Sequence, residues 1–192
     1  MTDKQQIIIK AAMDIISREG YSKCTIRNVA SRVGVTEPAV YRHFKNKLEL
    51  LIKMLEALQT AVLPAFSLPV EEGMDIEDCL CLFASKLFFT LTEHPEYRIF
   101  LFFEEAFHQE KDLKPTLLSL VERAQGKLTE SLIQLQTREI CRTDLPPESL
   151  ALMLMGTLRL MVSKTHMGYP ESWEKLRDQY VLLFTRMLQQ QK

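Results

Sequence analysis

The chain has 192 residues, of which 46% are hydrophobic and 26% charged, and its formal net charge is −1. This balance is that of an ordinary globular protein, and the length allows one sizeable core or a small domain joined to a larger one. No low-complexity stretch and no repeat with a period of about 20 to 50 residues is visible, which argues against a solenoid.

The charges are unevenly distributed along the chain. Residues 1–50 contain nine Lys and Arg against five Asp and Glu, whereas residues 51–192 contain fifteen against twenty. A basic N-terminal part on an acidic remainder is typical of a segment that binds a polyanion.

Neither a secretory signal nor a membrane span is predicted. Met1–Gln6 is polar, and the apolar run Ile7–Ile9 is too short for the core of a signal peptide. The longest nearly apolar stretch, Leu150–Val162, contains Arg159 and is shorter than a membrane-spanning helix. We therefore expect a cytoplasmic protein whose four cysteines are reduced and structural; these are Cys24, Cys79, Cys81 and Cys141.

Apolar residues recur with helical spacing along almost the whole chain, which predicts an all-α fold. The first helix ends at Gly20, and N-cap residues open the next three at Thr25, Thr36 and Asn46. Glu49 completes a capping box with Asn46. The apolar stripe of the fourth helix is predicted at Leu48, Leu51, Ile52, Leu55, Leu58 and Val62, and the later helices at residues 76–93, 95–109, 114–138, 147–167 and 171–190.

The tripeptide Gly34-Val35-Thr36 joins two short predicted helices. A turn of three or four residues with a glycine between two helices is typical of a helix-turn-helix, whose second helix enters the major groove of DNA. Val40 and Phe44 have the spacing to hold this second helix on the core. Glu37, Pro38, Tyr41 and Arg42 are then left on its outer side.

The stretch TIRNVASRVGVTEPAVYRHFKNKLELL, from Thr25 to Leu51, resembles the TetR family of bacterial transcription regulators, and IIIKAAMDIISREGYSKCTI before it is similar to the family's first helix. The resemblance implies a three-helix DNA-binding domain over residues 1–47, with the helix-turn-helix at about 25–44, and a helical effector-binding and dimerisation domain over residues 48–192. It also implies a repressor that binds a pseudo-palindromic operator as a homodimer. A small apolar or amphipathic effector would release it from the double-stranded DNA.

The family motif carries over residue by residue to a set of predicted DNA contacts. Thr25 and Lys47 match phosphate contacts, and Tyr41 and His43 match a pair that holds the DNA backbone. The positions that vary within the family are expected to read the bases, and here they are Thr36, Glu37, Pro38 and Ala39. Arg27 and Arg42 are expected to reach a phosphate or a guanine.

Each of these assignments has a purely structural alternative. Tyr41 packs its ring on the core in one interpretation and contacts DNA in the other. Lys47 is either a phosphate ligand or a solvated surface charge. Glu37 repels phosphate, so it either accepts a hydrogen bond from a cytosine amino group or points away from the DNA.

The second part of the chain is predicted to hold the effector and the partner subunit. Its aromatic and methionine residues suit an apolar pocket, although a filled core would have the same composition; the candidate pocket residues are Phe88, Phe102, Phe103, Met153 and Thr157. The last two helices are apolar on several sides, which favours a dimer interface over burial within one subunit. The candidate interface residues are Leu150, Leu154, Leu158, Met161, Trp173, Leu176, Tyr180 and Phe184.

Other classes of function have less support in the sequence. The chain has no nucleophile elbow, P-loop or dinucleotide fingerprint, so we expect neither an enzyme nor a bound cofactor. Glu105 and His108 have the spacing of helix-borne metal ligands, but the second such pair that a two-metal carboxylate site needs is missing, so we expect no metal. The remaining alternative is a helical adaptor that uses its N-terminal part against a protein partner.

Overall fold

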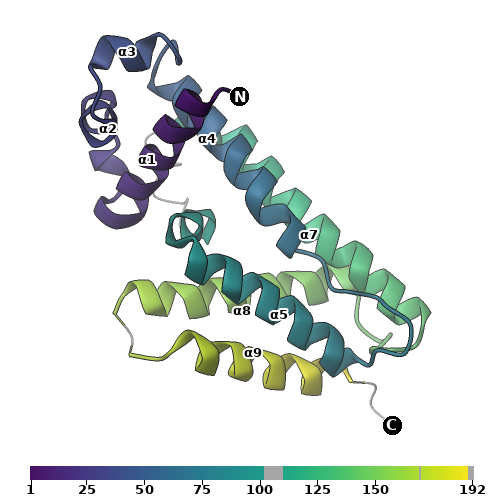
Figure 1. Cartoon of the computed structure of the whole chain (residues 1–192). Coiled ribbons are helices and arrows are strands. Elements are labelled where there is room, and N and C mark those ends of the chain that lie inside the picture. Colours follow the sequence, from purple (N-terminus) through teal and green to yellow (C-terminus); the bar gives the residue numbers. More distant parts are fainter. Residues whose placement is uncertain (102–109, 169, 190–192) are drawn as a thin grey trace. The chain divides into compact units, whose positions relative to one another are not determined.

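The computed structural model describes residues 1–101, 110–168 and 170–189, and within these ranges every regular element is helical, as the sequence predicts (Figure 1). The elements of the N-terminal part are α1 (Asp3–Glu19), η1 (Tyr21–Lys23), α2 (Ile26–Val33), α3 (Glu37–Tyr41) and α4 (Lys47–Val62). They are followed by η2 (Leu63–Ala65), α5 (Ile76–Glu93), η3 (Pro95–Leu101), η4 (Lys111–Leu113), α7 (Lys114–Thr137), α8 (Pro147–His166) and α9 (Trp173–Leu188).

The chain forms two compact units. Unit 1 consists of Met1–Val62 and His94–Leu120, and unit 2 consists of Leu63–Glu93 and Val121–Lys192. Packing therefore places α4 in the same unit as α1 to α3, and α7 contributes residues to both units. The functional boundary at residue 47 stays a prediction.

Side-chain caps begin α2 and α4 at the two positions that the sequence predicts. Thr25 Oγ1 accepts a hydrogen bond from the Asn28 amide at 3.1 Å, and Asn46 Oδ1 accepts one from the Glu49 amide at 2.8 Å. Glu49 returns a bond to the amide of Lys45 at 2.6 Å, one residue before the position that a capping box predicts. Thr36 occupies the N-cap position of α3, but its side chain makes no capping bond.

Gly34 forms the turn between α2 and α3. Its φ of 73° is in the left-handed region, which L-residues with a Cβ adopt only with strain. The amide of Val35 donates to the carbonyl of Ala30 at 2.9 Å, so the end of α2 has the hydrogen bond of a Schellman motif. This bond fixes the direction in which the chain enters α3.

The core of unit 1 is built by α1, α2 and α4, and the short helix α3 packs against α2. Its largest fully buried side chains include Ile8, Ile15, Phe44 and Leu51. On α4 the buried stripe is Leu50, Leu51, Met54, Leu55, Leu58 and Val62. Leu48 and Ile52 are half-buried instead, so the predicted stripe is wrong at these two positions. The reason is that Leu50 and Met54 complete the same helical face and lie nearer its centre.

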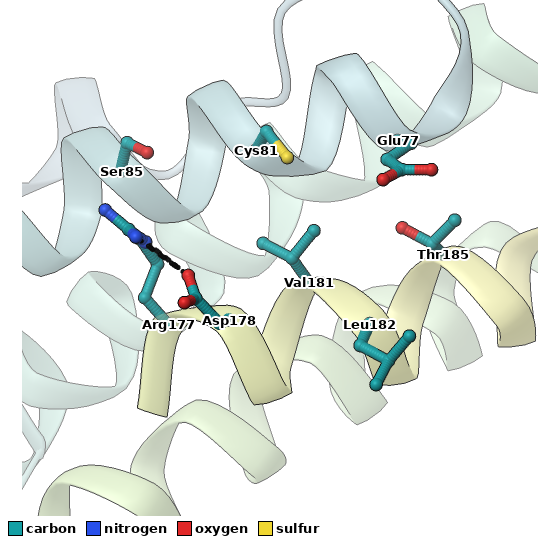
Figure 2. Close-up of a pocket in the computed structure, with 8 residues that line it drawn as sticks. All are labelled: Glu77, Cys81, Ser85, Arg177, Asp178, Val181, Leu182 and Thr185. Carbon is teal, nitrogen blue, oxygen red and sulfur yellow. Dashed lines mark hydrogen bonds and ion pairs between the residues drawn. The ribbon is translucent and has the colours of Figure 1, made fainter. Parts of the chain in front are cut away.

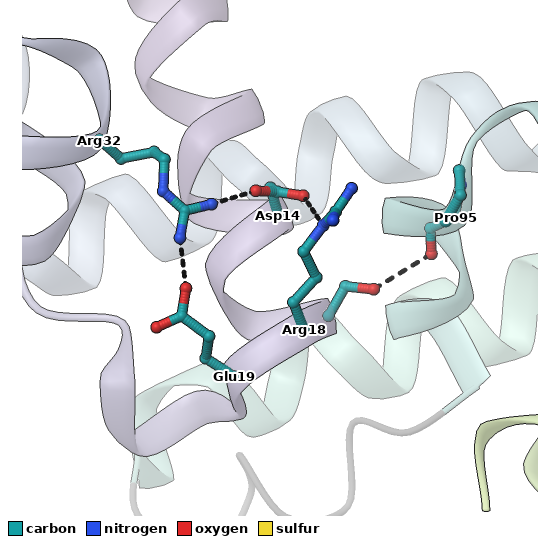
Figure 3. A network of polar contacts seen from close by, with 6 residues as sticks. Asp14, Arg18, Glu19, Arg32 and Pro95 are labelled. Atoms are coloured by element: carbon teal, nitrogen blue, oxygen red, sulfur yellow. Dashed lines mark hydrogen bonds and ion pairs between the residues drawn. The ribbon is translucent and has the colours of Figure 1, made fainter. Parts of the chain in front are cut away.

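Ion pairs fasten α2 to the C-terminal half of α1 (Figure 3). The guanidinium of Arg32 donates to the carboxylates of both Asp14 and Glu19, and Arg18 pairs with Asp14 on the same helix. Ser17 donates a hydrogen bond to the carbonyl of Pro95 at 3.2 Å, which ties η3 to α1 within unit 1. Arg18 and Arg32 are therefore neutralised within the chain.

Unit 2 has an aromatic core between α5 and α9. Tyr180 of α9 lies 4.6 Å from Phe184, 6.2 Å from Phe88 and 6.3 Å from Phe83, measured between ring centroids. Its hydroxyl donates to the carbonyl of Leu154 on α8 at 3.1 Å, which satisfies the polar end of a fully buried side chain. Burial raises the pKa of Tyr180 well above its ordinary value.

The predicted helix at 95–109 is wrong in its first half, because Pro95–Leu101 forms the 3-10 helix η3. The described residues of the segment pack against α1 and α4. Residues 102–109, the second half of the predicted helix, lie outside the described part of the chain.

Replacing Gly34 with alanine tests the turn. An added Cβ would meet nothing within 4 Å, so the cost comes from the left-handed backbone alone and amounts to about 1 to 2 kcal/mol of the free energy of unfolding. The control is Gly126→Ala in the middle of α7, where the space is equally open and alanine stabilises a helix by up to about 1 kcal/mol. Urea denaturation followed by circular dichroism measures both, and equal shifts of the two variants would contradict the account of the turn.

Candidate nucleic-acid interface

The ten predicted DNA contacts all lie in unit 1, on α2, α3, the turn after α3 and the start of α4. Ala39, His43 and Lys47 are half-buried, and the other seven are exposed. Tyr41 keeps 50% of its surface exposed, so its ring is not part of the core. None of these side chains is needed to fill the interior of unit 1.

Two buried residues hold α3 in place. Val40 is 0% exposed and Phe44 is 2% exposed, as their helical spacing predicts. The amides of His43 and Phe44 both donate to the carbonyl of Val40, at 2.9 and 3.1 Å, which continues the helical turn past Tyr41. Gln5 of α1 donates to the carbonyl of His43 at 3.4 Å. The outer face of α3 is thus presented on a fixed base.

The two predicted phosphate contacts lie at the starts of different helices, Thr25 at α2 and Lys47 at α4. Tyr21 of η1, just before α2, contacts Lys47. Lys47, at the start of α4, places its Nζ 4.3 Å from the centroid of the Tyr21 ring and 3.8 Å from Oε1 of Glu110. Cys24, which directly precedes Thr25, is buried, and burial raises the pKa of its thiol to about 11 while the nearby Lys47 charge lowers it. Lys47 and the beginning of α2 are therefore neighbours.

The basic residues of unit 1 differ in how far they are neutralised. Arg18 and Arg32 are paired with carboxylates of α1 (Figure 3). Among the residues that the structure describes, Arg27, Arg42 and Lys45 have no ion-pair partner. Part of the unpaired positive charge of unit 1 is thus on α2 and on the segment after α3, next to the predicted base-reading residues. Such a surface attracts an anionic partner.

The residues predicted for the dimer interface are placed differently from the expectation. Six of the eight are buried within unit 2, and the other two, Met161 and Trp173, are half-buried. The buried six are Leu150, Leu154, Leu158, Leu176, Tyr180 and Phe184. Side chains that are already covered within one chain have no surface left for a partner. The correction is that they form the core of unit 2, while the dimer itself stays a prediction.

The predicted effector residues do not form one cluster in the described chain. Phe88 is 3% exposed and stacks edge-on against Trp173 at 5.9 Å, whereas Met153 is 46% exposed on α8. Thr157 is half-buried one helical turn after Met153. Phe102 and Phe103 lie outside the described residues, as do Glu105 and His108. Phe88 is therefore a core residue and Met153 a surface residue.

A groove of about 480 Å³ lies instead between α5 and α9 (Figure 2). Glu77 and Thr185 lie at one end of it, and Ser85 and the ion pair of Arg177 with Asp178 at the other. Cys81, Val181 and Leu182 line the part between them. Burial and the nearby acids Glu77 and Asp78 raise the pKa of the Cys81 thiol.

Within the described ranges, no group of three or more histidine, cysteine, aspartate or glutamate residues is arranged to hold a metal ion. None of the described helices is long and apolar enough to cross a membrane.

The model of the family "Bacterial regulatory proteins, tetR family" matches residues 8–54, the segment that contains α1, α2, α3 and the first half of α4. Over these residues the chain matches the TetR family. It is 43% identical over 51 residues to the tetracycline repressor protein class A from transposon 1721 of Escherichia coli, a match that covers 27% of this chain and 24% of that repressor. The matched part thus spans about a quarter of the length of that relative.

Two further comparisons cover most of the chain. The nucleoid occlusion factor SlmA of Vibrio atlanticus is 24% identical over 153 residues, which are 80% of this chain and 78% of that protein. The crystal structure of the transcriptional regulator FadR from Bacillus subtilis, in complex with stearoyl-CoA, superimposes with a TM-score of 0.76 at 21% identity and covers 94% of this chain and 97% of that one. This likeness shows that the chain has the fold of that regulator.

The structure adds two residues to the environment of the interface that sequence reasoning did not find. Tyr21 and Glu110 both contact the predicted phosphate ligand Lys47. The aromatic ring of Tyr21 directly after the helix-ending Gly20 was a usable signal for a buried anchor. Glu110 had no such signal, because it is far from Lys47 in the sequence and belongs to no motif.

Proposed function

We propose that this TetR-family chain is a cytoplasmic, non-enzymatic repressor that binds a pseudo-palindromic operator as a homodimer and is released by a small effector. The observation that carries the proposal is the arrangement of α3. Val40 and Phe44 fix the helix from below, while the exposed Thr36, Glu37 and Pro38 form its outer N-terminal side. In a helix-turn-helix these N-terminal residues reach the base edges.

Affinity would come mainly from the phosphate backbone. Thr25 is an N-cap whose helix presents free amide groups and a positive dipole end to an anion. Lys47 opens α4 close to the start of α2 and supplies a positive charge there. Arg27 and Arg42 have no partner in the described chain and are free to contact phosphate or guanine. Thr36 has a hydroxyl that makes no capping bond, which leaves it available to DNA.

The dimer would use the outer faces of α8 and α9. Leu152, Gly156 and Leu160 are exposed at four-residue intervals on α8, and Leu182 and Leu183 are exposed on α9. Leu152 and Leu160 keep 63% and 62% of their surface, which is unusual for large apolar side chains on a helix that already buries its other face. The glycine between them allows a second helix to approach closely.

The effector would be apolar or amphipathic. The FadR structure holds stearoyl-CoA, an amphipathic molecule, in a protein with the same fold. In this chain the effector would bind in unit 2 and change the separation or tilt of the two DNA-binding helices of the dimer. A full switch of operator occupancy needs a preference of about 5.5 kcal/mol for one state.

Titration of fluorescent DNA from the protein's own upstream intergenic region tests the DNA interface. We expect tight, sequence-selective binding that both Tyr41→Ala and Lys47→Ala weaken. Lys47→Ala removes a positive charge and should also make the fall of log affinity with log salt less steep by about 1, whereas Tyr41→Ala removes no charge and should leave this slope unchanged. The control is Lys53→Ala. Lys53 has the same charge as Lys47 but lies further along α4, where it is paired with Glu56. Equal and weak binding of all variants to any duplex would contradict the proposal and favour the adaptor.

Leu160→Glu tests the dimer face. A carboxylate in an apolar helix interface is buried without a partner, so we expect the variant to sediment as a monomer while the wild type sediments as a dimer. Phe89→Glu is the matched control, because Phe89 is 66% exposed on α5 and lies outside the proposed face. A Leu160→Glu variant that remains dimeric, or a Phe89→Glu variant that dissociates, would show that another surface joins the subunits.

A further inference from the structure

Lys47 has two partners inside unit 1 before any DNA is bound. Its Nζ lies over the ring of Tyr21 at 4.3 Å and 3.8 Å from the carboxylate of Glu110. The side chains of Lys47 and Glu110 each keep 31% of their surface exposed. The predicted phosphate ligand is therefore held by an aromatic face and partly neutralised by an acid from a distant part of the chain.

The position of Tyr21 limits where Lys47 can go. Tyr21 is 4% exposed and cannot follow the lysine outward. Burial raises the pKa of its hydroxyl above the ordinary value, and the negative charge of Glu110 raises it further. Glu110 thus acts on both Tyr21 and Lys47.

We propose that Glu110 competes with a DNA phosphate for Lys47 and thereby lowers the affinity of the protein for its operator. The proposal rests on the proposed DNA-binding function. A carboxylate and a phosphate bind the same ammonium group, and an ionised Glu110 that remains beside Lys47 also repels the incoming phosphate. At 3.8 Å and with both side chains partly exposed, the pair is weak enough for a phosphate to displace it.

The place of Glu110 in the chain connects this competition to the rest of the fold. Glu110 directly precedes η4, whose Leu113 is 2% exposed and which packs against α4. η4 leads without a break into α7, the helix that has residues in both compact units. A displacement of η4 along α4 would change the distance from Glu110 to Lys47 and with it the positive charge available to DNA.

Glu110→Gln tests the competition, because it removes the charge and keeps the shape. We expect operator DNA to bind about two- to fivefold more tightly per subunit at low salt, which is the range that a partly exposed ion pair is worth. Asp112→Asn is the matched control. It removes an acid two residues further on that is exposed and that forms no ion pair with Lys47 in the described chain, so we expect less than a twofold change. Thermal unfolding of each variant checks that the fold is kept.

The same substitution in a Lys47→Ala background decides whether the effect passes through the lysine. We expect Glu110→Gln to have no effect there. A full effect in that background, an effect equal to that of Asp112→Asn, or weaker DNA binding by Glu110→Gln would overturn the competition. If the wild-type protein does not bind its upstream DNA at all, the proposed function fails instead, so the two failures are distinguishable.

Discussion

The helix that would read the DNA, α3, is five residues long, and a helix of that length does not persist in water by its own hydrogen bonds. It exists here because Val40 and Phe44 are buried on one side and the left-handed turn at Gly34 fixes the chain at its beginning. The exposed residues of the predicted interface that lie on α3 depend on this anchoring. The core of unit 1 therefore determines whether α3 is folded and its outer face is available to DNA.

The basic residues of unit 1 likewise divide into those that stabilise the fold and those that remain available to a binding partner. Arg32 bridges Asp14 and Glu19 and so holds α2 on α1, whereas Arg27 on the same helix has no ion-pair partner in the described chain. Lys47 is intermediate, because it is held by Tyr21 and Glu110 but remains partly exposed. The basic excess of the first fifty residues thus consists of structural pairs and of charges left for an anionic partner.

Local signals in the sequence predicted local structure well. The caps at Thr25 and Asn46, the turn at Gly34 and the burial of Val40 and Phe44 each depend on neighbours within a few residues, and all are found. The apolar pattern of the last two helices could not separate core from surface. Leu154 and Tyr180, predicted to face a partner, are in the core, whereas Leu152 and Leu160 of the same pattern are exposed. Glu110 meets Lys47 through tertiary packing alone, which no motif encodes.

In the proposed function, two copies of α3 enter successive major grooves on one face of a duplex. Hydroxyl-radical footprinting of the protein on its own upstream intergenic DNA tests this most directly. The account predicts two symmetric protected patches whose centres are separated by a whole number of helical turns of about 10 to 10.5 base pairs, and their loss with Tyr41→Ala. Uniform protection along the duplex, or a single patch without symmetry, would contradict it.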